Sequence, residues 1–242
     1  MTTSYFLLTL VLTFIISTVT LLTGFGVGSV LTPTFTLFYD VKTAVFLVSI
    51  VHLGNNVLKF GLFAKHIDTR ILMRFGFVSV TGALLGSLLQ GSFQTSWVRI
   101  ALAAFLIVSG GSEFLFQSSS TRISQKYDLF GGFFSGLMGG LIGNQGAIRS
   151  AYLLNYDLTK EAFVATATSI AILIDLTRIP VYIYQQAEQE KTAWGTLTVV
   201  IIIAFAGTFV GKQLLAKVSL EQFRKFVAAF LILFGVFLLF EP

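Results

Sequence analysis

The chain has 242 residues, of which 55% are hydrophobic and only 11% are charged, and its formal net charge is +5. Soluble domains carry about 25% charged residues, so this composition excludes a soluble globular protein, and its high hydrophobicity excludes intrinsic disorder. The absence of cysteine excludes disulfides, cysteine-ligated metal sites and thiol catalysis. The class that remains is an integral membrane protein.

Long apolar runs without strict alternation predict an all-α membrane protein rather than a barrel. At about 20 residues per spanning helix, the chain accommodates roughly eight to ten segments. In chain order we expect helical segments at 5–22, 26–39, 43–60, 71–90, 97–116, 129–142, 146–156, 161–183, 194–211 and 223–240. The first run lacks a basic region before it and a small-residue cleavage motif after it, so we expect it to be retained.

A polar, serine-rich stretch at 118–128 lies near the midpoint and predicts a linker between two transmembrane repeats, at 1–117 and 129–242. Several residues of the first repeat recur in the same order in the second: Gly26 as Gly143, Tyr39 as Tyr156, Gly82 as Gly207, Gly86 as Gly211, Arg99 as Arg224 and Gly110 as Gly235. Five segments in each half make the repeats inverted, because an odd number of segments reverses the direction of the second half.

The basic residues change loops between the halves, as inversion and the positive-inside rule require. The loop after the third segment is basic in the first half, whereas the loop before the last segment is basic in the second half. These basic residues are Lys59, Lys65, Arg70 and Arg74, and then Lys212, Lys217, Arg224 and Lys225. We therefore expect a multi-pass inner (plasma) membrane protein with cytoplasmic basic loops and both termini outside. Because the charges flank spans and form no continuous patch, no nucleic-acid partner is expected.

Two segments, 26–39 and 146–156, are too short to span and follow glycine-rich breaks at 24–28 and 139–146. Paired interruptions at matching places in two halves indicate a transporter binding site. Close helix packing is the alternative, and it fits the pairs Gly82/Gly86 and Gly207/Gly211 better. At the breaks, we expect half-helix N-termini to supply N–H donors, from Gly26, Gly28 and Ser29 and from Asn144, Gln145 and Gly146.

Arg149 lies one turn after the second break, and an ionisable residue at membrane depth indicates function. Its guanidinium offers fixed donors suited to an oxyanion; alternatively, it reaches an interface or pairs with Asp175. Asp175 and Arg178 share a helix face at i, i+3, which predicts an ion pair or a group that carries a coupling proton.

His52, Asn55 and Asn56 occupy the corresponding segment of the first half. His52 titrates near neutral pH or serves as a hydrogen-bonded packing residue. Asn55 and Asn56 donate to an oxyanion or bond across helices. No HExxH, GxSxG or Walker motif occurs, and two histidines do not make a metal site, so neither an enzyme, a cofactor nor a bound metal is expected.

The chain resembles the TauE/SafE family of sulfite exporters, also called the toluene-sulfonate uptake family. The resemblance lies in Gly24-Phe25-Gly26-Val27-Gly28 with Pro33, in Ile67-Asp68-Thr69-Arg70 before Gly82-Ala83-Leu84-Leu85-Gly86, and in Gly143-Asn144-Gln145-Gly146-Ala147-Ile148-Arg149. It implies an inner-membrane permease for sulfite, sulfonates or related small anions.

We therefore expect a secondary transporter for a small oxyanion, most simply sulfite or an organosulfonate, that works by alternating access with proton or potential coupling. A passive anion channel and a carrier of carboxylates or metal cations stay open as alternatives. The expected partners are the anionic substrate, the bilayer and a coupling proton, while a monomer and a homodimer are both open.

Overall fold

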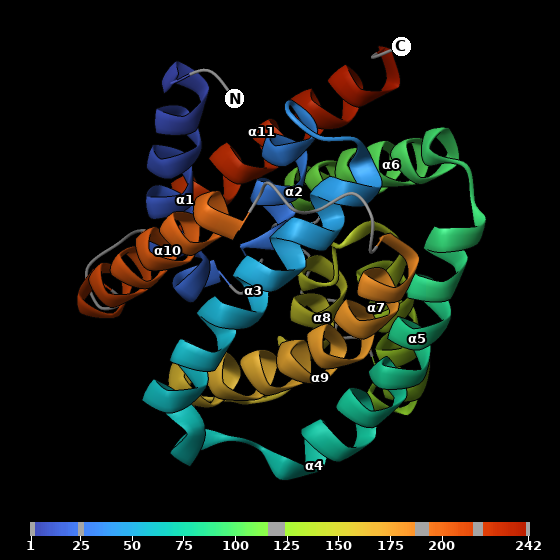
Figure 1. Cartoon of the computed structure of the whole chain (residues 1–242). Coiled ribbons are helices and arrows are strands. Elements are labelled where there is room, and N and C mark those ends of the chain that lie inside the picture. The colour runs from blue at the N-terminus through green and yellow to red at the C-terminus, as the bar shows by residue number, and fades with distance from the viewer. Residues whose placement is uncertain (1–2, 24–26, 116–123, 187–193, 215–219, 241–242) are drawn as a thin grey trace.

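The computed structural model describes residues 3–23, 27–115, 124–186, 194–214 and 220–240, which form helices joined by short connections (Figure 1). The helices are α1 (Thr3–Thr23), α2 (Gly28–Thr36), α3 (Val41–Phe63), η1 (Ala64–His66), α4 (Thr69–Ile71), η2 (Leu72–Gly76), α5 (Phe77–Ser92), α6 (Thr95–Leu115), η3 (Gln125–Tyr127), α7 (Asp128–Ile142), α8 (Gly146–Leu153), α9 (Lys160–Gln186), α10 (Trp194–Leu214) and α11 (Leu220–Phe240). Each predicted apolar run coincides with a helix, and within these residues no strand occurs. The all-α expectation is confirmed.

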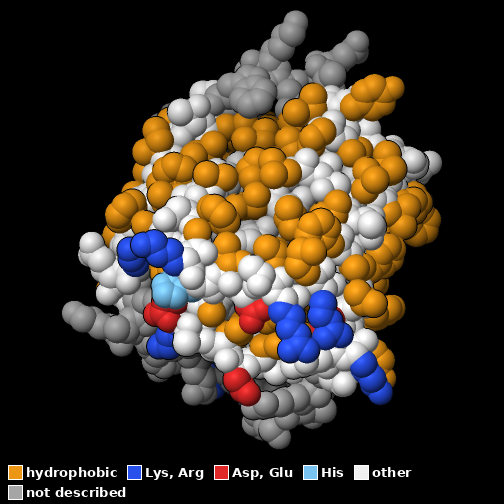
Figure 2. Space-filling model, turned by 90° about the horizontal axis from the view of Figure 1, so that it is seen from below, with side chains coloured by type: hydrophobic (Ala, Val, Ile, Leu, Met, Phe, Trp, Pro, Cys, Tyr) orange, Lys and Arg blue, Asp and Glu red, His pale blue; other side chains and the backbone are white. Residues whose placement is uncertain are grey.

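Several of these helices are long and apolar enough to cross a bilayer. Within the described ranges, five stretches meet this criterion: Val41–His66, Thr69–Ser92, Thr95–Ser112, Lys160–Gln185 and Leu197–Leu214. Shorter apolar helices lie at Phe6–Thr18 and Ala228–Phe240. Figure 2 shows a broad apolar surface on one face, with the charged side chains gathered in a band. Such a surface is stable against lipid but not against water, so the chain is a multi-pass membrane protein.

α3 and α9 cross in the middle of the molecule, between two outer groups of helices (Figure 1). α5 packs against α7 on one side, α1 packs against α10 on the other, and α6 packs against α11. α2 and α8 are short helices, of which α2 contacts α3 and α8 contacts α9. The start of α1 and the end of α11 lie at the same end of the molecule, opposite the corner formed by η1 and α4.

α8 folds back along α7, so this pair is a helical hairpin. Gly143 ends α7 with a φ of 74°, a left-handed conformation that glycine adopts without steric cost. Past this turn, the Gln145 carbonyl accepts a hydrogen bond of 3.2 Å from Ser135 Oγ in α7. Further along α8, the Tyr152 ring lies directly over Gly131, leaving no room there for a Cβ.

The open end of this hairpin is closed by a hydrogen bond from the Tyr156 hydroxyl to the Asp128 carboxylate. Asp128 begins α7 and is 2% exposed, whereas Tyr156 follows α8. Burial and the hydrogen bond to Asp128 raise the pKa of the Tyr156 phenol, although Arg74 and Arg70 oppose the rise. The phenol therefore stays protonated and remains a donor at neutral pH.

The interface between α5 and α7 depends on glycines that bring the two backbones into contact. A Cβ at Gly82 would overlap the carbonyl oxygen of Phe133, and a Cβ at Gly86 would overlap that of Leu137. Small residues at such positions let membrane helices approach closely. Close packing, expected for this glycine pair from its spacing, is confirmed.

The interface between α10 and α1 uses the corresponding glycines in the same way. A Cβ at Gly207 would overlap the carbonyl oxygen of Phe14, and a Cβ at Gly211 would overlap that of Thr18. Phe14 and Thr18 lie 119 positions before Phe133 and Leu137. Gly82 and Gly86 lie 125 positions before Gly207 and Gly211. Both interfaces therefore use a pair of glycines in the same way.

We expect Gly136→Ala to lower the stability of the folded protein, because a Cβ there would overlap the backbone oxygen of Ser79. Overpacking of a close interface costs about 1–3 kcal/mol. Gly111→Ala in α6 is the matched control, since nothing lies within 4 Å of its added Cβ. Thermal unfolding in detergent measures both variants. Equal midpoint temperatures for the two would contradict the packing described above.

Candidate functional site

The two glycine breaks meet in the interior of the protein. Ser29, in the first turn of α2, donates from Oγ to Asn144 Oδ1 at 2.8 Å. A Cβ at Gly28 would lie 3.1 Å from the carbonyl oxygen of Gly143. Since Ser29 and Asn144 are both buried, this junction joins segments 115 residues apart away from the surface. Gly26 lies outside the described residues.

The second break is surrounded by buried polar atoms that have no hydrogen-bond partner among the described residues. Gln145 and Gly146 are buried, and Gly146 begins α8. The amide Nδ2 of Asn144 and both amide atoms of Gln145 are buried without a hydrogen bond, as is Oγ1 of Thr32 in α2. Buried polar groups are normally hydrogen-bonded, so a cluster of unsatisfied ones at one place points to a ligand.

Arg149 lies in α8 and is 3% exposed. Its Nε and Nη1 are buried and have no hydrogen-bond partner. Two alternatives for Arg149 were an interfacial position and an ion pair with Asp175. Arg149 does not reach the surface, and Asp175 forms its ion pair with Arg178. Buried guanidinium donors without acceptors are costly, so the Nε and Nη1 atoms of Arg149 are candidate donors to a ligand.

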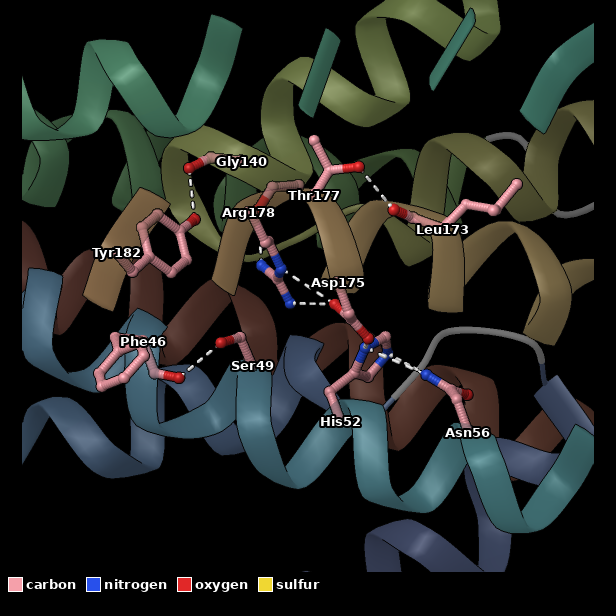
Figure 3. Close-up of polar contacts among 11 residues, drawn as sticks. Phe46, Ser49, His52, Asn56, Gly140, Leu173, Asp175, Thr177, Arg178 and Tyr182 are labelled. Carbon is pink, nitrogen blue, oxygen red and sulfur yellow. Dashed lines mark hydrogen bonds and ion pairs between the residues drawn. The ribbon is translucent and has the colours of Figure 1, made fainter. Parts of the chain in front are cut away.

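A buried ion-pair network joins α3 to α9 next to this cluster (Figure 3). Asp175 Oδ1 accepts from Arg178 Nε at 2.9 Å and from Nη2 at 2.8 Å, while Oδ2 lies 2.6 Å from His52 Nδ1. Because a carboxylate only accepts, Nδ1 carries the proton. Asn56 Nδ2 lies 3.1 Å from Nδ1 and 3.3 Å from Nε2, and of these two ring nitrogens only Nε2 can accept from the amide once Nδ1 carries a proton.

Arg178 and Tyr182 of α9 also cap the C-terminal end of α7. Arg178 Nη1 donates to the Gly139 carbonyl at 2.6 Å, and the Tyr182 hydroxyl donates to the Gly140 carbonyl. Gln90 of α5 donates to the next carbonyl, that of Leu141, at 3.1 Å. The last carbonyls of a helix lack intrahelical donors, so these side chains supply donors to the carbonyls of Gly140 and Leu141. The Gly139 carbonyl accepts from Arg178 in addition to the Gly143 N–H at 3.1 Å.

Asn55 and Asn56 point to different neighbours, although they are adjacent in α3. Asn55 Oδ1 accepts from Thr208 Oγ1 of α10 at 2.6 Å, and its Nδ2 is buried without a partner. Asn56 contacts His52. Asn55 therefore bonds across helices, which is one of the two roles expected for it. Asn56 belongs to the ion-pair network.

The expectation that Lys59 lies in a loop is wrong. α3 continues to Phe63, and Lys59 is only 4% exposed within it. A signal for its burial was present in the sequence, because Lys59 occupies the position that Arg178 occupies 119 residues later. Tyr182 was also missed, since its contact with Gly140 joins residues far apart in the chain.

The charges of this site are unbalanced. In the described part of the chain, the buried cations are Lys59, Arg149 and Arg178, whereas Asp175 is the carboxylate that lies among them. Electrostatic interactions reach Arg149 from Lys59, His52 and Asp175, so these groups share one low-dielectric region. Three basic side chains and one carboxylate therefore share this buried region.

A separate cavity of about 350 Å³ lies away from this site. It is lined by Thr36, Phe38, Tyr39, Asp40, Val41, Thr95, Arg99 and Leu238. None of these residues belongs to the buried cluster, so the cavity is not the site itself.

Comparison with known proteins agrees with this picture. No curated protein matches the chain. The family described as Sulfite exporter TauE/SafE, a family of membrane transporters rather than enzymes, matches residues 9–238. Because the match covers nearly the whole chain, the protein belongs to the TauE/SafE sulfite exporter family.

Proposed function

We propose that the chain is a secondary transporter that binds a small oxyanion of the sulfite or sulfonate kind at the junction of the two glycine breaks. The observation that carries this proposal is Arg149, a buried guanidinium whose Nε and Nη1 have no partner. Asn144, Gln145 and the first turns of α2 and α8 would supply further donors. Membership of a sulfite exporter family supports the same substrate class.

The excess of buried basic side chains at the site supports an anionic substrate over a metal cation. A metal-cation carrier would need converging carboxylate or imidazole ligands, whereas Asp175 is already paired with Arg178 and His52. Carboxylate anions have the required negative charge. Their oxygens lack the tetrahedral arrangement around sulfur in sulfonates and the pyramidal arrangement in sulfite.

Reciprocal contacts support two inverted repeats that rock about this site. Besides the glycine pairs of α5 and α10, a Cβ at Gly110 would lie 2.6 Å from the Ala228 carbonyl oxygen, and a Cβ at Gly235 would lie 2.8 Å from that of Ala103. Each residue is related to its equivalent by 125 positions. Equivalent interfaces in two halves suit alternating access, in which the halves exchange arrangements around a fixed site.

Coupling and orientation belong to the same proposal. His52 would bind the coupling proton as a second proton on its ring, because the Asp175 carboxylate 2.6 Å from Nδ1 would stabilise the imidazolium. The corner at η1 and α4, which contains Arg70 and is followed by Arg74, would face the cytoplasm under the positive-inside rule. The start of α1 and the end of α11 would then face outward across the inner membrane (Figure 1).

The test is sulfite flux in proteoliposomes that contain the purified chain. We expect saturable flux that changes when a pH gradient or a membrane potential is imposed. Protein-free liposomes are the control. Flux that rises linearly with sulfite concentration and ignores both gradients would favour a passive channel, and no anion flux above the control would overturn the proposal.

A further inference from the structure

Thr32 of α2 carries a buried hydroxyl that has no partner among the described residues. The residue is 0% exposed, and its Oγ1 makes no hydrogen bond. Two other buried threonines of the same helix behave differently: Thr34 Oγ1 donates to the Val30 carbonyl at 2.8 Å, and Thr36 Oγ1 donates to the Pro33 carbonyl at 2.7 Å. A carbonyl three or four residues earlier is the usual acceptor for a threonine in a helix. The hydroxyl of Thr32 does not use one and is therefore available to a ligand.

The neighbours of Thr32 place this hydroxyl at the junction of the two glycine breaks. A Cβ at Gly143 would lie 3.4 Å from Thr32 Oγ1. Gly28 and Ser29, four and three residues before Thr32 on the same face of α2, reach the same turn. A Cβ at Gly28 would lie 3.1 Å from the Gly143 carbonyl oxygen, and Ser29 Oγ donates to Asn144 Oδ1 at 2.8 Å. One face of α2 thus lies against the turn between α7 and α8.

The side chains of that turn also lack hydrogen-bond partners. Ser29 occupies Oδ1 of Asn144, whereas Nδ2 of the same amide is buried without a partner. Both amide atoms of Gln145, the next residue, are buried and unpartnered as well. A hydroxyl from the first half and amide groups from the second half are therefore unsatisfied around one turn. Leaving buried donors without acceptors costs free energy, which a ligand with acceptor oxygens would remove.

Thr32 occupies the position in the first half that Arg149 occupies in the second. The two residues are 117 positions apart, which is the offset that relates Gly26 to Gly143. Thr32 lies four residues after the start of α2, Arg149 lies three residues after the start of α8, and the two helices contact each other. Both side chains have buried polar atoms without a partner. The two equivalent positions therefore differ in charge but share unsatisfied donors.

We infer that Thr32 is a further substrate-binding residue, whose hydroxyl donates a hydrogen bond to an oxygen of the bound anion. The inference rests on the proposed function and adds to it a neutral donor from the first half of the chain. Arg149 supplies charge from the second half, and Thr32 supplies a directional contact without adding charge. A hydrogen bond to an ionised acceptor is stronger than one between neutral groups, so this single hydroxyl contributes measurably to affinity.

The test is sulfite binding to the full chain in detergent, measured by isothermal titration calorimetry. Thr32→Val removes the hydroxyl and keeps the branched shape, so sulfite affinity should fall by about tenfold or more, as the loss of one hydrogen bond to a charged group does. The thermal unfolding midpoint of this variant without anion should equal or exceed that of the wild type, because Oγ1 has no partner in the described protein to lose.

Two further variants make the comparison specific. Thr32→Ser keeps a hydroxyl at this position and should retain most of the sulfite affinity. Thr34→Val is the matched control, since Thr34 is 1% exposed on the same helix and its hydroxyl already donates to the Val30 carbonyl. This control should leave sulfite affinity unchanged.

Each outcome has a distinct meaning. Weaker sulfite binding in Thr32→Val, with binding retained in Thr32→Ser and Thr34→Val, supports the inference. Unchanged affinity in Thr32→Val, an equal loss in Thr34→Val, or a marked drop in the unfolding midpoint of Thr32→Val would overturn it. In those cases, sulfite binding that is lost in Arg149→Gln would leave the proposed function in place. No sulfite binding to the wild type would overturn the inference together with the proposed function.

Discussion

Replacing Arg149 with glutamine should abolish anion transport and leave the protein as stable as the wild type or more so. The two buried donors Nε and Nη1 are free to bind an anion. Each hydrogen bond to a charged group contributes about 1.5–3 kcal/mol, so losing both lowers anion affinity by about 100-fold or more. The fold loses nothing comparable, because these two atoms make no contact with a described acceptor.

Loss of transport together with unchanged or higher stability separates a binding role of Arg149 from a structural one. Transport is measured as sulfite uptake into proteoliposomes, and stability as the thermal unfolding midpoint in detergent without added anion. Arg149→Lys serves as the graded control: it keeps the charge but not the bidentate geometry, so its uptake should fall between those of the wild type and Arg149→Gln. Full uptake by Arg149→Gln would exclude Arg149 from the site. A large drop in its melting temperature would instead assign Arg149 to the fold.

Asp175→Asn should destabilise the protein strongly. Asp175 is fully buried and neutralises Arg178, with which it makes contacts of 2.8 and 2.9 Å. Removing one partner of a buried ion pair costs about 3–5 kcal/mol, because the other charge remains without compensation. The loss also frees His52 and weakens the only described ion-pair connection between α3 and α9. The measurement is again the thermal unfolding midpoint.

The double variant Asp175→Asn/Arg178→Gln tests the cause of this loss. It removes both charges, so it should recover a substantial part of the stability lost in Asp175→Asn alone. Recovery will be incomplete, since Arg178 also donates to the Gly139 carbonyl at 2.6 Å. If the double variant is as unstable as the sum of the two single variants, the charges act independently and the network described above is not a coupled unit.

The order of the helices could be predicted because a long apolar run has the length that a helix needs to span the bilayer. The breaks were visible as glycines, and Arg149 and Asp175 were visible as charges inside apolar runs. The direction of the chain after a break was not visible: Gly143 adopts φ 74°, and composition does not say that α8 then returns along α7. The ion pair between Asp175 and Arg178 followed from their spacing, whereas His52 joined it through a contact across 123 residues.

Lys59 shows a second limit of the sequence. A lysine near the end of an apolar run fits an interfacial position as well as a buried one, because its long side chain can reach water. What decides between them is the packing of neighbouring helices around α3, and no local pattern encodes that packing. The match of Lys59 to Arg178 at an offset of 119 positions indicated that Lys59 is buried. That match is found only when the two halves of the sequence are aligned.

The capping of α7 also determines which sign of ion this break can hold. An interrupted membrane helix presents two opposite poles: carbonyl oxygens at the end of the first part, which coordinate cations such as Na⁺, and amide groups at the start of the second, which attract anions. Here the carbonyls of Gly139, Gly140 and Leu141 are already occupied by donors from Arg178, Tyr182 and Gln90. Three carbonyls of the pole that would attract a cation are thus occupied, which leaves the opposite pole for the anion that we propose.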